Sequence, residues 1–333
     1  MRVLLLTGAE VEGHCARPNQ RPSPPIPSPR AGRGERTGKS RVFQPLLGLI
    51  TFVLLVSSAT AQDLFLPNKK DSLHFAVIGD SGTGGSAQYE VARQMTAYRT
   101  KFPYNLVVML GDNLYGSESP RSYQTKFEMP YKDLLAAGVK FYATLGNHDD
   151  PKQRFYKPFN MNGQRYYTFK PHDRVRLFAL DSNYMDPEQL AWLERELKGS
   201  DSPWKICFFH HPLYSSGKRH GSDEELRNFL EPLFLKYGVK AVLAGHEHFY
   251  ERLKPQKGLY YFISGGSAKL RRGNIVRTDL TAKGFDKDYH FMLIEIDGDI
   301  LHFQAIARTG ATVDSGIVTL QPEIKAQTAA SAK

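Results

Sequence analysis

The chain has 333 residues, of which 41% are hydrophobic, so it is long enough and apolar enough to form one large globular domain or two. Its formal net charge is +10, but residues 1–61 hold eight Lys and Arg against three Asp and Glu, so this stretch carries half of the excess. Because the rest of the chain has no long basic run, its charge does not support nucleic-acid binding.

The first 61 residues differ in character from the rest. Residues 1–41 are rich in Arg, Pro, Gly and Ser, and we predict a disordered extension or a misassigned start, with translation beginning downstream of Met1. Residues 42–61 read as a signal peptide, because the apolar run at 46–56 is too short to span a bilayer and a small-residue cleavage site follows it at 59–61. An uncleaved anchor helix is the alternative.

Signal cleavage would release a mature protein that begins at Gln62, without stable membrane association, in the periplasm or outside the cell. Cys15 lies before the expected cleavage point and Cys207 after it, so no intramolecular disulfide is expected. Cys207 lies among apolar residues and is predicted to be a buried small hydrophobic side chain.

From residue 73 onward, predicted strands and helices alternate without an internal repeat or linker. After a short segment at 62–72, we expect one α/β domain with two packed sheets at 73–322 and a disordered tail at 323–333. Helices are predicted at 88–100, 121–137, 187–198 and 226–237. Strands are predicted at 75–78, 106–110, 141–145, 166–169, 175–180, 206–209, 241–244, 260–263, 290–296, 300–307 and 317–320.

Five of these strands end in polar side chains that can bind metal. Buried ionisable groups are costly unless they are paired or bind a metal, and a hydrolytic metal pair needs carboxylate, amide and imidazole ligands. Any one of these residues could be structural, but their repetition at five strand ends favours a metal site. The candidates are Asp80, Asp112 with Tyr115, Asn147 with His148 and Asp149, His210 with His211, and His246 with His248.

The order of these motifs resembles the signature of calcineurin-like metallophosphoesterases over roughly residues 73–310. Most of that superfamily carries His two residues after the first Asp, whereas this chain has Gly82 there and Tyr115 after the second motif. This paired change resembles the purple acid phosphatase branch, in the small single-domain form of the tartrate-resistant acid phosphatases. The resemblance implies a four-layer α/β/β/α sandwich, classed as α/β or α+β, with a dinuclear metal site at the carboxyl ends of the strands.

The resemblance also implies the ligands of two metal ions. Asp80, Tyr115 and His248 would hold the first ion, and Asn147, His210 and His246 the second, with Asp112 bridging both. A phenolate and carboxylates suit Fe(III), while two imidazoles and an amide oxygen suit Fe(II), Zn or Mn. Three anionic ligands against five metal charges leave a positive site for a phosphate dianion. A bond from Tyr115 to Fe(III) would give a visible absorption band.

The implied activity is that of an acid phosphatase, hydrolysing phosphate monoesters by in-line attack of a metal-activated hydroxide with no phosphoenzyme. Asn147 and His148 would contact the substrate, and His148 would protonate the leaving group, with Asp149 fixing its tautomer. His220 resembles a second family proton donor, although it lies one residue further from His210 than the family pattern. His211 could contact substrate or pack locally.

Two other functions remain open from the sequence. One is phosphodiester or other phosphoester hydrolysis at the same metals, and the other is a metal-free binding protein. The basic run at 269–272 reads as a solvated surface, with a substrate-facing loop as the alternative. We expect a monomer that acts on a small-molecule phosphoester. The natural substrate, the second metal and the pH optimum are not readable from the sequence.

Overall fold

The computed structural model describes residues 63–276 and 278–320. The predicted extension at 1–41, the signal peptide at 42–61 and the tail at 323–333 lie outside the described residues. Within the described ranges, none of the helices has the length and apolar character needed to cross a membrane. The description below therefore concerns the predicted α/β domain.

The first sheet has six strands in the spatial order β13-β12-β11-β1-β2-β3. β1 pairs in parallel with β2 on one side and antiparallel with β11 on the other, near the middle of the sheet. β2 pairs in parallel with β3, and the last three strands form an antiparallel run. The strands are β1 Leu73–Ile78, β2 Leu106–Met109, β3 Lys140–Ala143, β11 His290–Asp297, β12 Ile300–Ala307 and β13 Thr312–Thr319.

The second sheet has seven strands in the order β10-β8-β9-β7-β6-β5-β4. Its central strands β5, β6, β7 and β9 are parallel, and the strands at both edges pair antiparallel. Both sheets are therefore mixed, as predicted. The strands are β4 Tyr167–His172, β5 Val175–Ala179, β6 Trp204–Phe209, β7 Ala241–Ala244, β8 Tyr250–Leu253, β9 Tyr260–Ser264 and β10 Thr281–Phe285.

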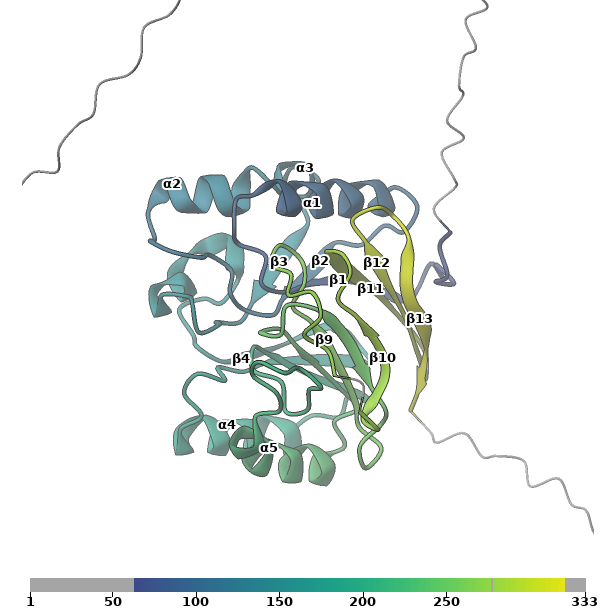
Figure 1. Cartoon of the computed structure of the whole chain (residues 1–333). Coiled ribbons are helices and arrows are strands. Elements are labelled where there is room, and N and C mark those ends of the chain that lie inside the picture. Colours follow the sequence, from purple (N-terminus) through teal and green to yellow (C-terminus); the bar gives the residue numbers. More distant parts are fainter. Residues whose placement is uncertain (1–62, 277, 321–333) are drawn as a thin grey trace, which may run out of the picture. The chain divides into compact units, whose positions relative to one another are not determined.

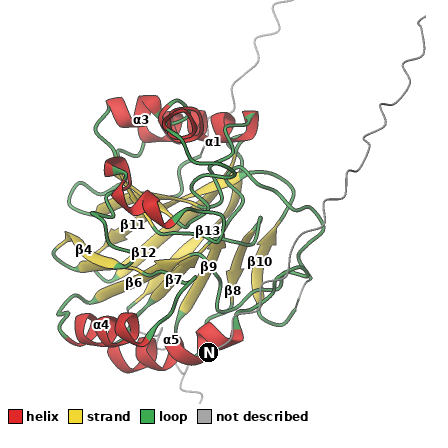
Figure 2. Ribbon diagram, turned by 90° about the vertical axis from the view of Figure 1, so that its left-hand side faces the viewer, coloured by secondary structure: helices red, strands yellow, loops and turns green. Residues whose placement is uncertain are grey.

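Helices cover the outer face of each sheet (Figure 1). The helices over the first sheet are α1 Ser86–Arg99, α2 Pro120–Tyr123, the π-helical turn η1 Gln124–Glu128 and α3 Lys132–Ala136. Those over the second sheet are α4 Pro187–Lys198 and α5 Glu224–Tyr237, and Figure 2 shows both against the strands β6 and β7. Two 3₁₀ turns, η2 Pro151–Phe155 and η3 Lys157–Phe159, follow β3.

The two-residue period of the strands separates the hydrophobic layers. In β1, Phe75 and Val77 pack between the sheets, whereas Ala76 and Ile78 pack beneath the helices. In β6, Ile206 and Phe208 face the first sheet, while its Cys207 is fully buried on the helix side, as predicted for a small hydrophobic residue. The four-layer α/β/β/α architecture is therefore confirmed.

Most predicted elements are present, but three predictions were wrong. The helix expected over 121–137 is broken into α2, η1 and α3, because Pro130 has no N–H to continue the helix and the chain turns at 129–131. The edge strand β10 and its neighbour β8 were missed, since their side chains alternate poorly between apolar and polar. β13 begins five residues before its predicted start, because its exposed side chains hide the strand pattern. The helix start at Asp186 is confirmed, since its carboxylate accepts a hydrogen bond from the Gln189 N–H at 2.8 Å.

Candidate metal centre

The seven predicted ligands meet at one edge, where the carboxyl ends of strands from both sheets converge. Asp80 follows β1, Asp112 and Tyr115 follow β2, and Asn147 follows β3. The three ligand histidines follow β6 and β7 in the second sheet. The loops interlock through backbone bonds, because the Asp80 N–H donates to the Gly111 carbonyl at 3.1 Å and the Tyr115 N–H donates to the Gly82 carbonyl at 2.9 Å.

Three of the ligand side chains form a first triangle of donor atoms. The Tyr115 hydroxyl lies 3.1 Å from Asp80 Oδ1 and 3.3 Å from His248 Nε2, and these two atoms are 3.3 Å apart. Atoms bound about 2 Å from one ion, at right angles to each other, are about 3 Å apart. The phenol, the carboxylate and the imidazole are therefore spaced as ligands of a shared ion would be.

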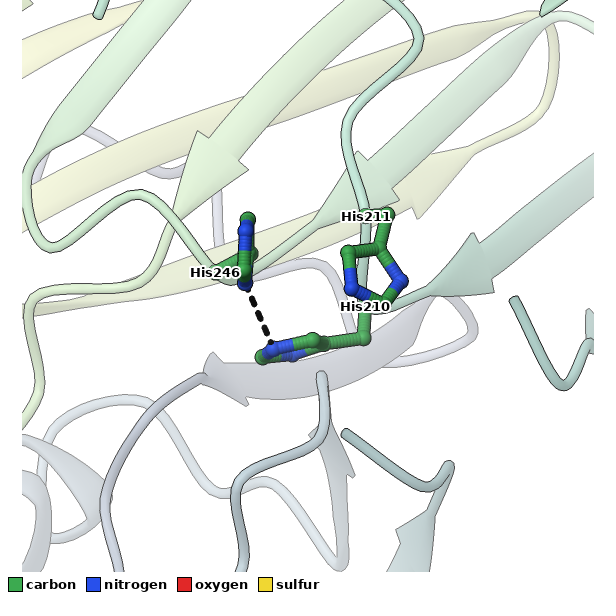
Figure 3. Close-up of side chains that lie close together, drawn as sticks. All are labelled: His210, His211 and His246. Carbon is green, nitrogen blue, oxygen red and sulfur yellow. Dashed lines mark hydrogen bonds between the residues drawn. The ribbon is translucent and has the colours of Figure 1, made fainter. Parts of the chain in front are cut away.

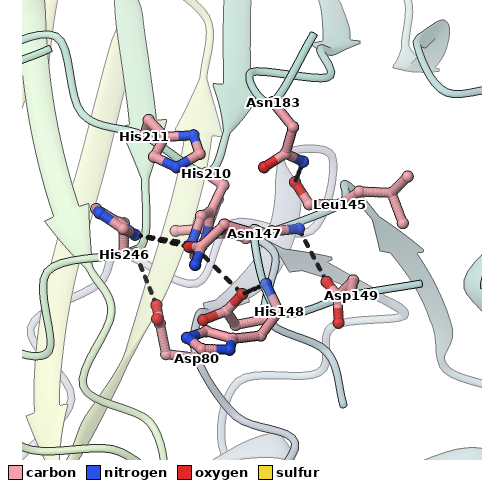
Figure 4. A network of polar contacts seen from close by, with 12 residues as sticks. Asp80, Leu145, Asn147, His148, Asp149, Asn183, His210, His211 and His246 are labelled. Atoms are coloured by element: carbon pink, nitrogen blue, oxygen red, sulfur yellow. Dashed lines mark hydrogen bonds and ion pairs between the residues drawn. The ribbon is translucent and has the colours of Figure 1, made fainter. Parts of the chain in front are cut away.

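A second triangle lies beside the first. Asn147 Oδ1 is 3.0 Å from His210 Nε2 and 3.0 Å from His246 Nδ1, and the two nitrogens are 3.1 Å apart (Figures 3 and 4). Its donors are neutral, in contrast to the carboxylate and phenol of the first triangle. The first triangle therefore offers hard anionic donors, and the second offers neutral ones.

Asp112 lies between the two triangles. Burial, then Asp80 and then Asp112 raise the pKa of the Tyr115 phenol, and Asp112 Oδ1 lies 3.5 Å from His210 Nε2. Glycine makes this approach possible, because a Cβ at Gly146 would lie 2.3 Å from both the Asp112 Oδ1 and N atoms. Gly111 has a φ of +85°, which directs the chain from β2 into the site.

Three of the ligands have left-handed backbone conformations. The φ angles are +54° at Asp80, +51° at Asp112 and +67° at His246. A non-glycine residue in this region costs about 1–3 kcal/mol unless its surroundings hold it, and such residues gather at functional sites. Asp80 is held partly by the His246 N–H, which donates to its Oδ2 at 2.8 Å (Figure 4).

The tautomer of His210 tests whether the site fits a metal. Its Nδ1 lies 2.9 Å from the Leu110 carbonyl, which can only accept, so Nδ1 carries the proton. Burial, and then His211, hold the pKa of this imidazole well below its usual range, so the ring is neutral. Its Nε2 lone pair therefore faces the Asn147 oxygen, another acceptor. Two lone pairs 3.0 Å apart repel each other unless a cation lies between them.

Among the described residues, the two buried carboxylates of the site also lack a cationic partner. Asp80 is fully buried and Asp112 is 1% exposed, and within the described ranges neither forms an ion pair with Lys or Arg. Burial, followed by the charge of Asp112, holds the pKa of Asp80 well above its usual range. Burial lowers the pKa of His246 to about 2 and that of His248 to about 3. Neutral imidazoles and crowded carboxylates are the forms in which these residues bind metal ions.

The donor set therefore fits two metal ions. Asp80, Asp112 and His248 offer atoms within 4.8 Å of one another, and His210, His211 and His246 form a second such group. Tyr115 and Asn147 complete the two triangles.

His148, the predicted proton donor, is exposed beside the site. Its backbone N–H donates to Asp112 Oδ1 at 3.0 Å, and its ring centroid is 5.1 Å from that of Tyr115. The backbone of His148 is thus fixed to the centre while its imidazole remains accessible to a substrate.

Asp149 does not bond the imidazole of His148 as expected, because its carboxylate binds other groups. Oδ2 accepts from the Gly146 and Asn113 N–H groups and from the Asn113 side chain, at 2.8–3.0 Å. Oδ1 accepts from the Leu114 N–H at 3.0 Å and from the Gln153 side chain at 2.8 Å. Asp149 therefore ties the loop after β2 to the loop after β3, and acts on the site by positioning Asp112 and Asn147.

His211 and His220 both pack against His246, at ring-centroid distances of 4.5 and 4.2 Å. His211 Nδ1 lies 2.9 Å from the Ser182 hydroxyl, which fixes its ring. His220 is exposed, and together with His211, Arg219 and His246 it lines a hollow of about 490 Å³. Both histidines are placed where a substrate bound at the second triangle could reach them.

Two structural features of the site were missed by the sequence analysis. The first is Ser182, which follows β5. Residues 181–183 are a sixth polar segment directly after a strand, so the pattern used for the other five could have revealed it. The second is Glu247, which lies between His246 and His248 where the chain bends at 246–249, and whose carboxylate bonds groups other than the predicted ligands. It is fully buried and accepts hydrogen bonds from the Gly221 N–H and the Asn274 side chain, both at 3.0 Å.

The basic run at 269–272 is not simply a solvated surface, so the preferred reading was wrong for two of its members. Lys269 Nζ lies 4.4 Å from the centroid of the Tyr115 ring. Arg271 is half-buried, and its backbone N–H donates to the His248 carbonyl at 3.0 Å. Only Arg272 is exposed as expected.

Comparisons with known proteins agree with this geometry. Residues 73–250 match the family described as calcineurin-like phosphoesterase. Tartrate-resistant acid phosphatase type 5 of Oryctolagus cuniculus is 28% identical over 236 residues, covering 58% of this chain and 72% of the relative. Purple acid phosphatase 4 of Arabidopsis thaliana is 26% identical over 266 residues, covering 68% and 78%. The structure of a purple acid phosphatase from yellow lupin (Lupinus luteus) seeds shares the fold, with a TM-score of 0.63 and 19% identity over 76% of this chain and 55% of that one.

Proposed function

Since the chain belongs to the calcineurin-like phosphoesterase family, with relatives among the purple and tartrate-resistant acid phosphatases, we propose that it is an acid phosphatase that hydrolyses phosphate monoesters. Hydrolysis of phosphoric ester bonds is the reaction class that the family and these relatives establish. The observation that carries the finer proposal is the first triangle, in which a phenol joins a carboxylate and an imidazole.

The proposed metals are Fe(III) at Asp80, Tyr115 and His248, and Fe(II), Zn or Mn at Asn147, His210 and His246, with Asp112 shared. When bound, two such ions would polarise the phosphate and lower the pKa of the attacking water. The donor chemistry supports this allocation, because the phenol and Asp80 are hard anionic donors and the second triangle is neutral. The Leu110 carbonyl keeps the His210 tautomer in the form that leaves Nε2 free.

The other residues of the site bind substrate and move protons. The accessible imidazole of His148 would donate a proton to the leaving alkoxide, and the Asn147 amide would contact a phosphate oxygen. His211, fixed by Ser182, and the exposed ring of His220 would contact the substrate from the side of the second triangle. Water attacks phosphorus directly in this proposal, so no phosphoenzyme forms.

The proposal includes export of the protein to the periplasm or the outside of the cell and action as a monomer on a small-molecule phosphoester. The apolar run and small-residue cleavage site before Gln62 support export.

The first test is a visible absorption spectrum, with metal analysis, of protein purified without chelator. We expect a broad band in the green to yellow region that disappears in Tyr115→Phe and persists in Tyr184→Phe, a matched change at an exposed tyrosine near the site. Monoester and diester substrates are then compared at equal concentration. If the protein is colourless, holds two Mn or Zn ions and hydrolyses the diester faster than the monoester, phosphodiester hydrolysis becomes the better assignment. Failure to retain any metal would favour a binding protein.

A further inference from the structure

Three basic side chains adjoin the metal centre and have no assigned role in the proposed reaction. Lys269 and Arg271 lie in the loop after β9, and Arg219 lies in the loop after β6. Lys269 Nζ lies over the ring of Tyr115, and the Arg271 backbone is bonded to His248. The loop after β9 is therefore attached to two ligands of the first triangle.

Arg271 has an unused hydrogen-bond donor at this edge. Within the described ranges its Nη1 atom is buried and has no hydrogen-bond partner. The nearest carboxylate atom, Glu247 Oε2, lies 3.8 Å away, which is too far for a hydrogen bond. Glu247 instead accepts from Gly221 and Asn274. A buried guanidinium N–H without an acceptor is costly, so this atom is suited to a ligand that supplies one.

The basic residues at this edge also repel each other, although acidic groups lie near them. Glu247 Oε2 lies 3.8 Å from Arg271 Nη1, and Asp223 and Glu224 line the same hollow as Arg219. Burial, followed by the charge of Arg219, lowers the pKa of Arg271, which indicates that the two guanidinium groups are close enough to repel each other. A bound anion would relieve that repulsion.

These basic residues are additional to what one phosphate needs. The proposed pair of metals, with its three anionic ligands, already balances a single phosphate dianion. Arg219 and His220 line the hollow of about 490 Å³ that also reaches His246, and the rings of His220 and His246 are 4.2 Å apart. An anion held by these basic residues would therefore lie beside the reacting phosphate, in a separate position.

We propose that Arg219, Lys269 and Arg271 form a second anion subsite, which binds a further phosphate group of the substrate. The preferred substrates are then phosphate monoesters that carry another phosphate close to the one that is removed. A guanidinium binds two oxygens of a phosphate group through its planar fork. This inference rests on the proposed function, because it extends the substrate of the same site.

The test compares two probes that cannot be hydrolysed, methylphosphonate and methylenediphosphonate, by isothermal titration calorimetry on the metal-loaded protein. The variants are Arg219→Met and Arg271→Met, and the matched controls are Lys218→Met and Arg272→Met, exposed neighbours on the same loops. We expect each variant, but neither control, to weaken methylenediphosphonate binding about ten-fold or more. Binding of methylphosphonate should change less than about two-fold.

Equal weakening of both probes would place these residues at the reacting phosphate and overturn the proposal. Unchanged binding of methylenediphosphonate in both variants would show that these basic residues do not bind a second phosphate, and this result would also overturn the proposal. Arg219 is exposed, so Arg219→Met keeps the test valid if Arg271→Met fails to fold, and metal content is measured for every variant. Wild-type turnover of a simple monoester is assayed separately, so failure of the proposed function is distinguishable from loss of the subsite.

Discussion

His148 combines a fixed backbone with an accessible side chain. Its N–H is bonded to Asp112, the proposed bridging ligand, so the residue cannot move without disturbing the centre. The imidazole itself is exposed and accepts substitution without creating a buried cavity. Among the proposed catalytic residues it is therefore well suited to mutation, since loss of activity can be separated from loss of folding.

We predict that His148→Ala lowers kcat about 100-fold or more for an alkyl phosphate, with both metals retained. The effect should be much smaller for p-nitrophenyl phosphate, because a phenolate of low pKa leaves without a proton donor. Steady-state kinetics with the two substrates, together with metal analysis, check this. An equal loss for both substrates would show that His148 binds phosphate and does not protonate the leaving group.

At the scale of single residues, the sequence predicted which side chains come together better than it predicted their hydrogen-bond partners. Asp80 and His248 could be placed together because both follow strands whose carboxyl ends meet at one edge. The partners of Asp149 could not be predicted, since the choice between His148 and the loop after β2 depends on how closely two loops pack. Glu247 was missed for a related reason, because its carboxylate bonds groups other than the predicted ligands.

At the scale of elements, short loops at strand ends determine the geometry of the centre. Buried apolar runs such as β2 and β6 were readily predicted, because the hydrophobic effect selects them in almost any packing. The edge strand β10, its neighbour β8 and the break at Pro130 were not predicted, because they depend on the strands and helices that pack against them. The loops that carry ligands are short and contain Gly where another backbone approaches.

Gly146 offers a test of that packing. Gly146→Ala would place a Cβ 2.3 Å from both the backbone N and Oδ1 of Asp112, so we predict a loss of about 1–3 kcal/mol in the free energy of unfolding. Bound metal should also fall, because the displaced carboxylate lies between the triangles. Gly85→Ala is the control, since a Cβ there would meet only the Thr83 hydroxyl at 3.4 Å. Chemical denaturation measures the free energy of unfolding, and metal analysis measures the bound metal. Equal losses in Gly146→Ala and Gly85→Ala would contradict this prediction.

At the scale of the whole molecule, the junction of the two sheets contains a buried group that links stability to pH. His290, at the start of β11, is fully buried, and its ring lies edge-on to that of Tyr250 in the second sheet, with centroids 5.6 Å apart. Burial lowers the pKa of His290 to about 3, from the ordinary value of 6.5. The folded protein therefore excludes a proton that the unfolded chain accepts.

The sign of the effect follows from that difference. The stabilising contribution of neutral His290 is complete above about pH 6.5 and is lost as the pH falls, at about 1.4 kcal/mol per pH unit. We predict that the wild type loses about 2 kcal/mol more stability between pH 6.5 and pH 5 than His290→Phe does. Chemical denaturation at the two pH values measures this. Parallel losses in both proteins would show that His290 does not control the acid response.

The position of β1 has a consequence for synthesis of the chain. β1 is made first, yet one of its two neighbours is β11, so that Phe75 pairs with Ile294. A ribosome delivers the amino-terminal half long before that partner exists, and until then β1 has an open apolar edge that can pair with other chains. Translation that stops between residues 248 and 290 would therefore release an aggregation-prone polypeptide, even though every proposed metal ligand had already been made.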